Sequence, residues 1–285
     1  MPKTIGNPLS WSARQIGSAF GHAGAVTDQA AVKDGAAEPE IRTLSTADIR
    51  DALRQGFADF QEFRSDVIFI VLVYPLMGVV LVALAIQGSF IQLVFPIVTG
   101  FALLGPFAAV GLYELSRRKE KGEETHWSTA FGVVQSPAFG AILILGIVHL
   151  VIFIAWLMAA DLIHRVTIGP ETPDEPVAFV NTVLQTSAGW AMIVIGILVG
   201  FVFACVVLAT SVVSFPMLLD RRVSVPIAVS TSIHVAQKNP VPILMWGAIV
   251  AASLFLGSIP LLLGLIIALP VLGHATWHLY RKAVA

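Results

Sequence analysis

Apolar and polar positions divide the chain into a polar first part and a series of long apolar runs. After residue 64, uncharged runs of about 20 residues recur, and each is long enough to cross the hydrocarbon core of a bilayer as a helix. The predicted spans are residues 67–86, 91–115, 138–162, 189–215, 241–257 and 260–280. The pattern therefore predicts an all-α, polytopic membrane bundle of about six transmembrane helices.

The polar first part contains two different segments. Residues 1–44 are rich in small and charged residues without apolar periodicity, so we expect them to be disordered. Residues 45–63 begin with a capping-box pattern, Ser45 followed by Asp48, and then show helical periodicity. Apolar residues recur there at Ile49, Leu53, Phe57, Phe60 and Phe63. This predicts an amphipathic helix in the membrane interface, at the start of a six-helix transmembrane domain over 45–285.

Lysine and arginine residues gather in alternate segments between the predicted spans, which sets the expected orientation. The loops on the other side hold a single basic residue, Arg165. Because basic residues favour the cytoplasmic side, both termini are expected in the cytoplasm, with the basic residues facing anionic lipid headgroups. The residues expected at the headgroups are Arg117, Arg118, Arg221, Arg222, Arg281 and Lys282.

A weak internal repeat accompanies this pattern. The even-numbered spans end in Leu-Ser-Arg-Arg from Leu115, Leu-Asp-Arg-Arg from Leu219 and Leu-Tyr-Arg-Lys from Leu279. An amphipathic or mixed segment precedes each pair of spans, at 45–63, 126–136 and 224–239. We therefore predict three repeats of an interfacial amphipathic helix followed by a helical hairpin.

Three motifs carry a family resemblance: ALRQGFADF, SFPMLLDRR with AVSTSIHVAQKNP, and the closing PVLGHATWHLYRK. Together they resemble the bacterial integral membrane family catalogued as domain of unknown function 2189. The resemblance covers nearly everything after about Thr43, and GHATWHLYRK is its most specific part. It implies a multi-pass protein of the bacterial inner membrane and implies no activity or cofactor.

Composition excludes several classes of function. Of 285 residues, 56% are hydrophobic and 12% are charged, and the net charge of −1 offers no basic tract for nucleic acid. A single cysteine, Cys205, allows no intramolecular disulfide, and no cleaved signal peptide is recognisable. Because phosphate-loop, nucleophile-elbow and CxxC motifs are missing from the sequence, an enzyme is the minority interpretation.

The closing motif places His274 and His278 on one face of the last predicted span. The repeat puts Glu114 at the position equivalent to His278, so these three side chains are candidates for a metal or haem site of nitrogen and oxygen ligands. The alternative, which we favour, is that the histidines anchor the helix at headgroup depth together with Trp277 and Tyr280.

His149 completes the candidate polar residues, near the middle of the third predicted span. Ionisable groups at that depth usually face a bundle interior, so a proton relay is one interpretation. The sequence offers no chain of titratable partners, and a neutral imidazole bonded to a neighbouring helix is favoured instead.

These observations favour a non-catalytic accessory, scaffold or assembly partner of a membrane complex. A small transporter or channel is the alternative, because prolines and glycines interrupt the second and sixth spans, at Pro96, Pro106, Pro260 and Pro270 among others. A metal- or haem-binding membrane protein is the third hypothesis, although no cofactor is firmly implied.

Overall fold

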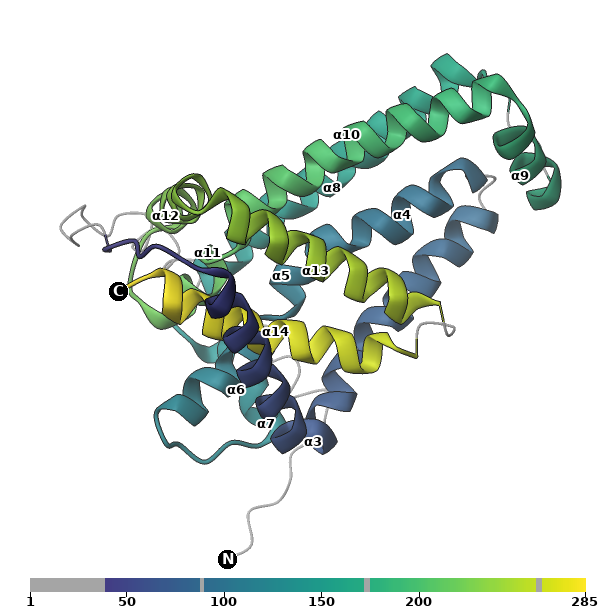
Figure 1. Ribbon diagram of the computed structural model, residues 1–285. Helices are drawn as coiled ribbons and strands as arrows, with labels where there is room; N and C mark the ends of the chain where they lie inside the picture. The colour runs from purple at the N-terminus through teal and green to yellow at the C-terminus, as the bar shows by residue number, and fades with distance from the viewer. Residues whose placement is uncertain (1–38, 88–89, 172–174, 260–262) are drawn as a thin grey trace, which may run out of the picture.

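The computed structural model describes residues 39–87, 90–171, 175–259 and 263–285, and the side chains of 64–75, 101, 127 and 128 lie outside the description. These described residues are almost entirely helical and form no strand, which confirms the predicted all-α class (Figure 1). The α-helices are α3 (Thr46–Gln87), α4 (Val94–Phe101), α5 (Gly105–Ala108), α6 (Val110–Glu120), α7 (Trp127–Ala130), α8 (Phe139–Thr167), α9 (Pro176–Gln185), α10 (Ser187–Ser211), α11 (Ser214–Asp220), α12 (Val225–Lys238), α13 (Pro240–Ser258) and α14 (Leu265–Ala283). Three short 3-10 helices, Ile91–Leu93, Ala102–Leu104 and Phe131–Gln135, complete the chain order.

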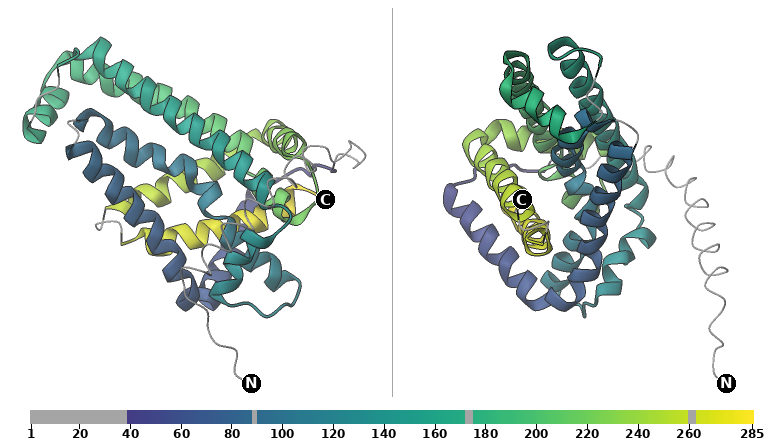
Figure 2. Two further views of the ribbon diagram at one scale, coloured as in Figure 1. Left: turned by 180° about the vertical axis from the view of Figure 1, so that it is seen from behind. Right: turned by 90° about the vertical axis from the view of Figure 1, so that its right-hand side faces the viewer.

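Three helical pairs project to the same side from a packed end of the molecule, as Figures 1 and 2 show. The pairs are α3 with α4, α8 with α10, and α13 with α14, and the partners of each pair are in contact. The packed end, called the base below, consists of residues 40–63, 110–120, 212–239 and 270–285. Helix α9 lies at the far tip of the α8–α10 pair.

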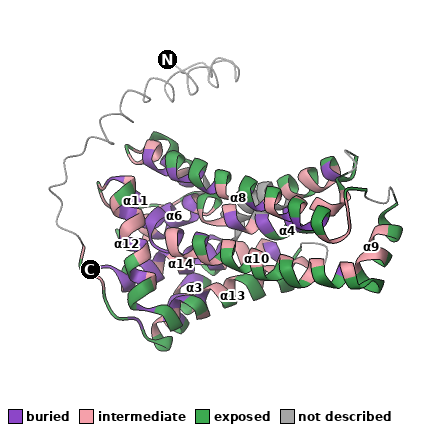
Figure 3. Cartoon of the chain, turned by 90° about the horizontal axis from the view of Figure 1, so that it is seen from above, coloured by how far each residue is buried: buried purple, intermediate pink, exposed green. Residues whose placement is uncertain are grey.

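The hydrophobic core lies mainly in the base (Figure 3). Its large side chains come from helices that are distant in sequence, which ties the first and last described helices to the middle of the chain. Side chains no more than 2% exposed there include Ile49, Tyr113, Phe215, Met217, Trp277 and Tyr280.

Four helical stretches of the described chain are long and apolar enough to cross a membrane: Ile91–Glu120, Phe139–Thr167, Ser187–Asp220 and Pro240–Ser258. They coincide with the predicted second to fifth spans. The predicted first span lies on α3, largely on residues whose side chains are outside the description, and residues 260–262 of the sixth are outside it too. A count of six spans and the threefold repeat therefore stay predictions.

Helix α3 runs without interruption from Thr46 to Gln87, so the expected interfacial segment 45–63 is the first part of one long helix. Its apolar face contacts protein: Ile49 and Phe63 are buried, whereas Phe57 is 45% exposed. The reason is α14, which packs along α3 and covers the stripe that the sequence pattern assigned to lipid.

The start of the described chain is bound to its end. Ile41 forms an isolated antiparallel bridge with Val284, and the backbone N–H of Arg42 donates to the carbonyl of Ala283 over 2.9 Å. Leu44 is buried and its N–H donates to the side chain of Asn239. Residues 40–44 are thus ordered, although the sequence prediction assigned them to the disordered segment; residues 1–38 lie outside the described part.

Candidate functional site

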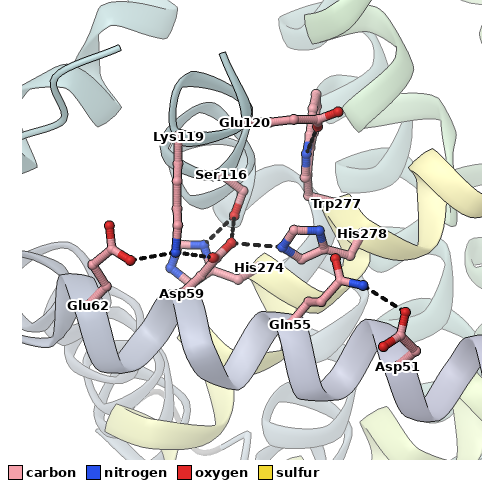
Figure 4. A network of polar contacts seen from close by, with 10 residues as sticks. All are labelled: Asp51, Gln55, Asp59, Glu62, Ser116, Lys119, Glu120, His274, Trp277 and His278. Carbon is pink, nitrogen blue, oxygen red and sulfur yellow. Dashed lines mark hydrogen bonds and ion pairs between the residues drawn. The ribbon is translucent and has the colours of Figure 1, made fainter. Parts of the chain in front are cut away.

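A cluster of polar side chains joins α3, α6 and α14 inside the base, and Figure 4 shows it from close by. The cluster, called the Asp59 cluster below, contains Asp59, Glu62, Ser116, Lys119, His274 and His278. Asp59 lies at its centre and is 3% exposed. The Ser116 hydroxyl donates to Asp59 Oδ2 over 2.6 Å, and Lys119 Nζ lies 2.9 Å from Oδ1. His278 Nε2 lies 2.8 Å from Oδ2.

Helical spacing explains why these residues meet. Each helix contributes a pair three or four positions apart, which places both members on one face: Asp59 and Glu62 on α3, Ser116 and Lys119 on α6, His274 and His278 on α14. Two glycines let the helices approach closely. A Cβ at Gly56 would lie 2.5 Å from the backbone nitrogen of Ala275, and one at Gly273 would lie 2.4 Å from Leu112.

The cluster keeps the Asp59 carboxylate ionised. Burial disfavours the charged form and by itself would raise the pKa of Asp59. Hydrogen bonds from His278, Lys119 and Ser116 outweigh that effect and lower the pKa of this carboxyl below its ordinary value. Asp59 therefore acts as a permanent anion that holds donors from the two neighbouring helices.

His274 is the most deeply buried member, with no exposed surface. Its Nδ1 lies 2.7 Å from Ser116 Oγ, and its ring lies 5.8 Å from that of Phe63. A serine hydroxyl has one proton, and because Asp59 accepts it, Nδ1–H of His274 donates to Ser116. Its Nε2 makes no hydrogen bond among the described residues and has the backbone of Leu112 nearby.

A cavity of about 400 Å³ opens beside the Asp59 cluster, within the size range of small-molecule sites. It lies between the same three helices, and every lining residue carries a polar or charged group. Its lining side chains are Gln55, Asp59, Ser116, Lys119, Glu120, His278, Arg281 and Lys282.

A second polar network joins the helix ends at which the Leu-x-Arg pattern of the predicted repeat occurs. Glu120 at the end of α6 accepts from Trp277 Nε1 over 3.0 Å and from Arg281 Nε over 3.0 Å. The hydroxyl of Tyr280 donates to Asp220 over 2.9 Å and accepts from Arg221 Nε over 3.0 Å. These contacts hold the ends of α6, α11 and α14 together, and Asp220, Arg221, Tyr280 and Arg281 belong to the Leu-x-Arg segments.

Glu114 lies apart from the two histidines. Glu114 is 3% exposed and forms ion pairs with two residues of its own helix. Its carboxylate oxygens lie 2.8 Å from Arg117 Nε and 2.6 Å from Arg118 Nε. His274 and His278 in turn contact Ser116 and Asp59. Within the described ranges, no group of three or more His, Cys, Asp or Glu side chains is placed to hold a metal ion.

The basic residues predicted at the headgroups are mostly engaged inside the protein. Arg117 and Arg118 bind Glu114, as described above, Arg221 and Arg281 belong to the second network, and Lys282 lies 2.6 Å from Asp51. Arg222 is exposed, and its side chain makes no hydrogen bond or ion pair with any described residue. Of the six, Arg222 is the one fully available to a headgroup.

His149 lies far from the Asp59 cluster, on α8. It is completely buried; its Nδ1 lies 2.9 Å from the carbonyl of Leu145, and its ring packs 5.2 Å from that of Phe215. Thr210 on α10 approaches Nε2 at 3.5 Å. The ring thus contacts α10 and α11, and its neutral state stays a prediction.

The sequence interpretation missed Asp59, Ser116 and Lys119. Asp59 lies on the polar side of the predicted amphipathic segment 45–63, and the sequence pattern distinguishes only apolar from polar faces. A usable signal existed in α3, where Asp51, Gln55, Asp59 and Glu62 follow one another at helical spacing. A polar stripe of that length beside an apolar one indicates a second contact surface.

Comparison with known proteins supports the membrane assignment. Residues 94–220, somewhat less than half of the chain, match the model of a family described as predicted integral membrane proteins and catalogued as domain of unknown function 2189. Over these residues the chain is similar to the same family that the sequence motifs resemble, and the match ends before the GHATWHLYRK motif. No curated protein and no solved structure matches the chain significantly.

Proposed function

We propose that this member of a family of predicted integral membrane proteins is a non-catalytic accessory, scaffold or assembly partner of a membrane complex. In this proposal the protein resides in the bacterial inner membrane, with the base and both termini on the cytoplasmic side. The bilayer surrounds the projecting helical pairs, and another membrane protein binds them laterally.

The observation that carries the proposal is the exposure of α10. Only 6% of the most apolar part of Ser187–Asp220 is buried inside the protein, against 39% for the neighbouring span Phe139–Thr167. Large side chains such as Ile197, Phe201 and Val202 are each about 60% exposed. A helix with so few internal contacts is free to bind lipid or a partner around most of its circumference.

The base supports the same proposal, because its polar groups are used to hold the helices together. The acids Asp59, Glu114 and Glu120 each bind basic side chains of the protein itself. The exposed Arg222 remains for contact with anionic headgroups. Such a base is a rigid platform that fixes the orientation of the projecting pairs.

The test places a photoreactive residue at Phe201 and, as a matched control, at the buried Phe215. In native membranes the Phe201 variant should cross-link to one defined membrane protein, and the Phe215 variant should give internal products alone. Deletion of the gene should then change the abundance or migration of the complex that contains that protein. The proposal would be contradicted if the Phe201 variant cross-linked to lipid alone and deletion of the gene left the membrane complexes unchanged.

A transporter or channel is the second candidate, because the span Ile91–Glu120 is broken. Its helix is interrupted by a 3-10 turn at Ala102–Leu104, and Pro106 follows directly. Interrupted spans expose backbone groups in many transporters. Flux into proteoliposomes that disappears in His149→Leu would support this candidate, and the absence of flux in the parent protein would exclude it.

A further inference from the structure

The cavity beside the Asp59 cluster combines basic side chains from two helices. Lys119 comes from the end of α6, and Arg281 and Lys282 come from the last turn of α14. Their side chains are 33%, 41% and 25% exposed, so each reaches solvent while it lines the cavity. Gln55 on α3 adds an amide to the opposite wall.

The two acids that line the cavity are already satisfied. Asp59 accepts from Ser116 and is paired with Lys119 and His278. Glu120 accepts from Trp277 and Arg281. The three basic side chains of the lining, Lys119, Arg281 and Lys282, exceed these two acids by one charge. The same bases are also paired with four acids outside the lining: Asp48, Asp51, Glu62 and Asp220.

The other partners of the lysines lie on the rim and hold them weakly. Glu62, which pairs with Lys119, is 56% exposed, and Asp51, which pairs with Lys282, is 31% exposed. Exposed ion pairs of this kind are screened by solvent and salt. An ammonium group has three N–H donors, so both lysines can turn a donor toward the cavity while the rim pairs rearrange.

We propose that this cavity binds the dianionic phosphate group of a phosphomonoester, with Lys119, Arg281 and Lys282 as its donors. The guanidinium of Arg281 offers paired donors that match phosphate oxygens, and the two lysines supply compact charge. The ligand has two possible sources, a lipid headgroup such as that of phosphatidic acid or a soluble phosphate compound. The inference goes beyond the accessory function and does not depend on it.

The experiment measures binding to the purified full-length chain in neutral detergent micelles at constant ionic strength. One arm adds phosphatidic acid, a second adds inorganic phosphate or glycerol 3-phosphate, and a control arm adds phosphatidylcholine. We expect saturable binding of phosphatidic acid and none of phosphatidylcholine. If the soluble phosphates also bind saturably, the site recognises a free phosphate group. If neither phosphatidic acid nor the soluble phosphates bind, the proposal is overturned.

Variants separate the cavity from general surface charge. Lys282→Gln and Arg281→Gln should each weaken phosphomonoester binding about tenfold, equivalent to about 1.4 kcal/mol. The matched control is Arg50→Gln, which removes an exposed arginine of α3 outside the cavity lining and should change the affinity less than about twofold. Lys282→Gln is the primary variant, because its partners Asp48 and Asp51 are both partly exposed to solvent. Equal weakening by Arg50→Gln and Lys282→Gln, or no effect of Lys282→Gln, would contradict the proposed site.

Discussion

Asp59 connects three helices that are distant from one another in the sequence. Its carboxylate contacts the Ser116 hydroxyl and the Lys119 ammonium group of α6 and the His278 imidazole of α14. With its side chain only 5% exposed, these contacts replace the water that the charge would otherwise need. The consequence is that a polar interaction, and not apolar contact alone, sets the position of α3 against α14.

Replacing Asp59 with Asn should therefore destabilise the protein strongly. Asparagine removes the charge that Ser116, Lys119 and His278 all contact, while Lys119 keeps its pair with Glu62, so we expect a decrease of about 1–3 kcal/mol in the free energy of unfolding. Asp51→Asn removes an acid at the rim of the same helix and should have little effect. Reversible unfolding in mixed detergent micelles measures both, and similar losses for the two variants would contradict this role of Asp59.

The same residue predicts a dependence on pH. Because the pKa of Asp59 is lowered in the folded state, its contribution is fully present above the ordinary aspartate pKa of about 4 and is lost as the pH falls further. The difference in stability between the parent protein and Asp59→Asn should be larger at neutral pH than below about pH 4, where it should shrink. A difference that grows on acidification would show that another group governs this behaviour.

At the residue level the sequence could predict neighbours on one helix but not partners across helices. The shared face of His274 and His278 followed from their spacing, and the binding of Glu114 by Arg117 and Arg118 was readable from the same rule. The contact of His278 with Asp59 joins positions 219 apart in the chain. It depends on how α3 and α14 are aligned, which no local pattern specifies.

Among the elements, α3 and α14 approach each other closely at Gly56. Its missing side chain lets Ala275 of α14 lie directly against the α3 backbone. Sequence periodicity found both helices and their apolar faces. It assigned the face of 45–63 to lipid, because an amphipathic pattern does not distinguish a membrane surface from another helix.

Gly56→Ala should therefore separate α3 from α14. A Cβ at this position would lie 2.5 Å from a backbone atom, so the helices must shift, and we expect a loss of about 1–3 kcal/mol of stability. Gly196→Ala on α10 is the matched control, because a Cβ there meets nothing within 4 Å. It should leave stability unchanged or raise it by up to about 1 kcal/mol. Unfolding curves that coincide for the two variants would argue against close α3–α14 packing.

The whole molecule combines a well-packed base with three sparsely packed helical pairs. Hydropathy identified the apolar spans, and the positions of basic residues identified the end at which they meet. Neither could show that most of those basic side chains bind acids of the same base, since that pairing depends on the folded arrangement. The exposed helical pairs and the self-contained base together motivate the proposed lateral binding of a membrane partner.

The central claim is that the base and the tip at α9 lie on opposite sides of one membrane. It is tested most directly in a Cys205→Ser background with single cysteines at Arg54, whose side chain is 82% exposed on the base, and at Glu175, which is exposed beside α9. A membrane-impermeant maleimide applied to intact spheroplasts should label Glu175→Cys and should label Arg54→Cys only after the membrane is opened. Equal labelling of both cysteines before opening would contradict the account.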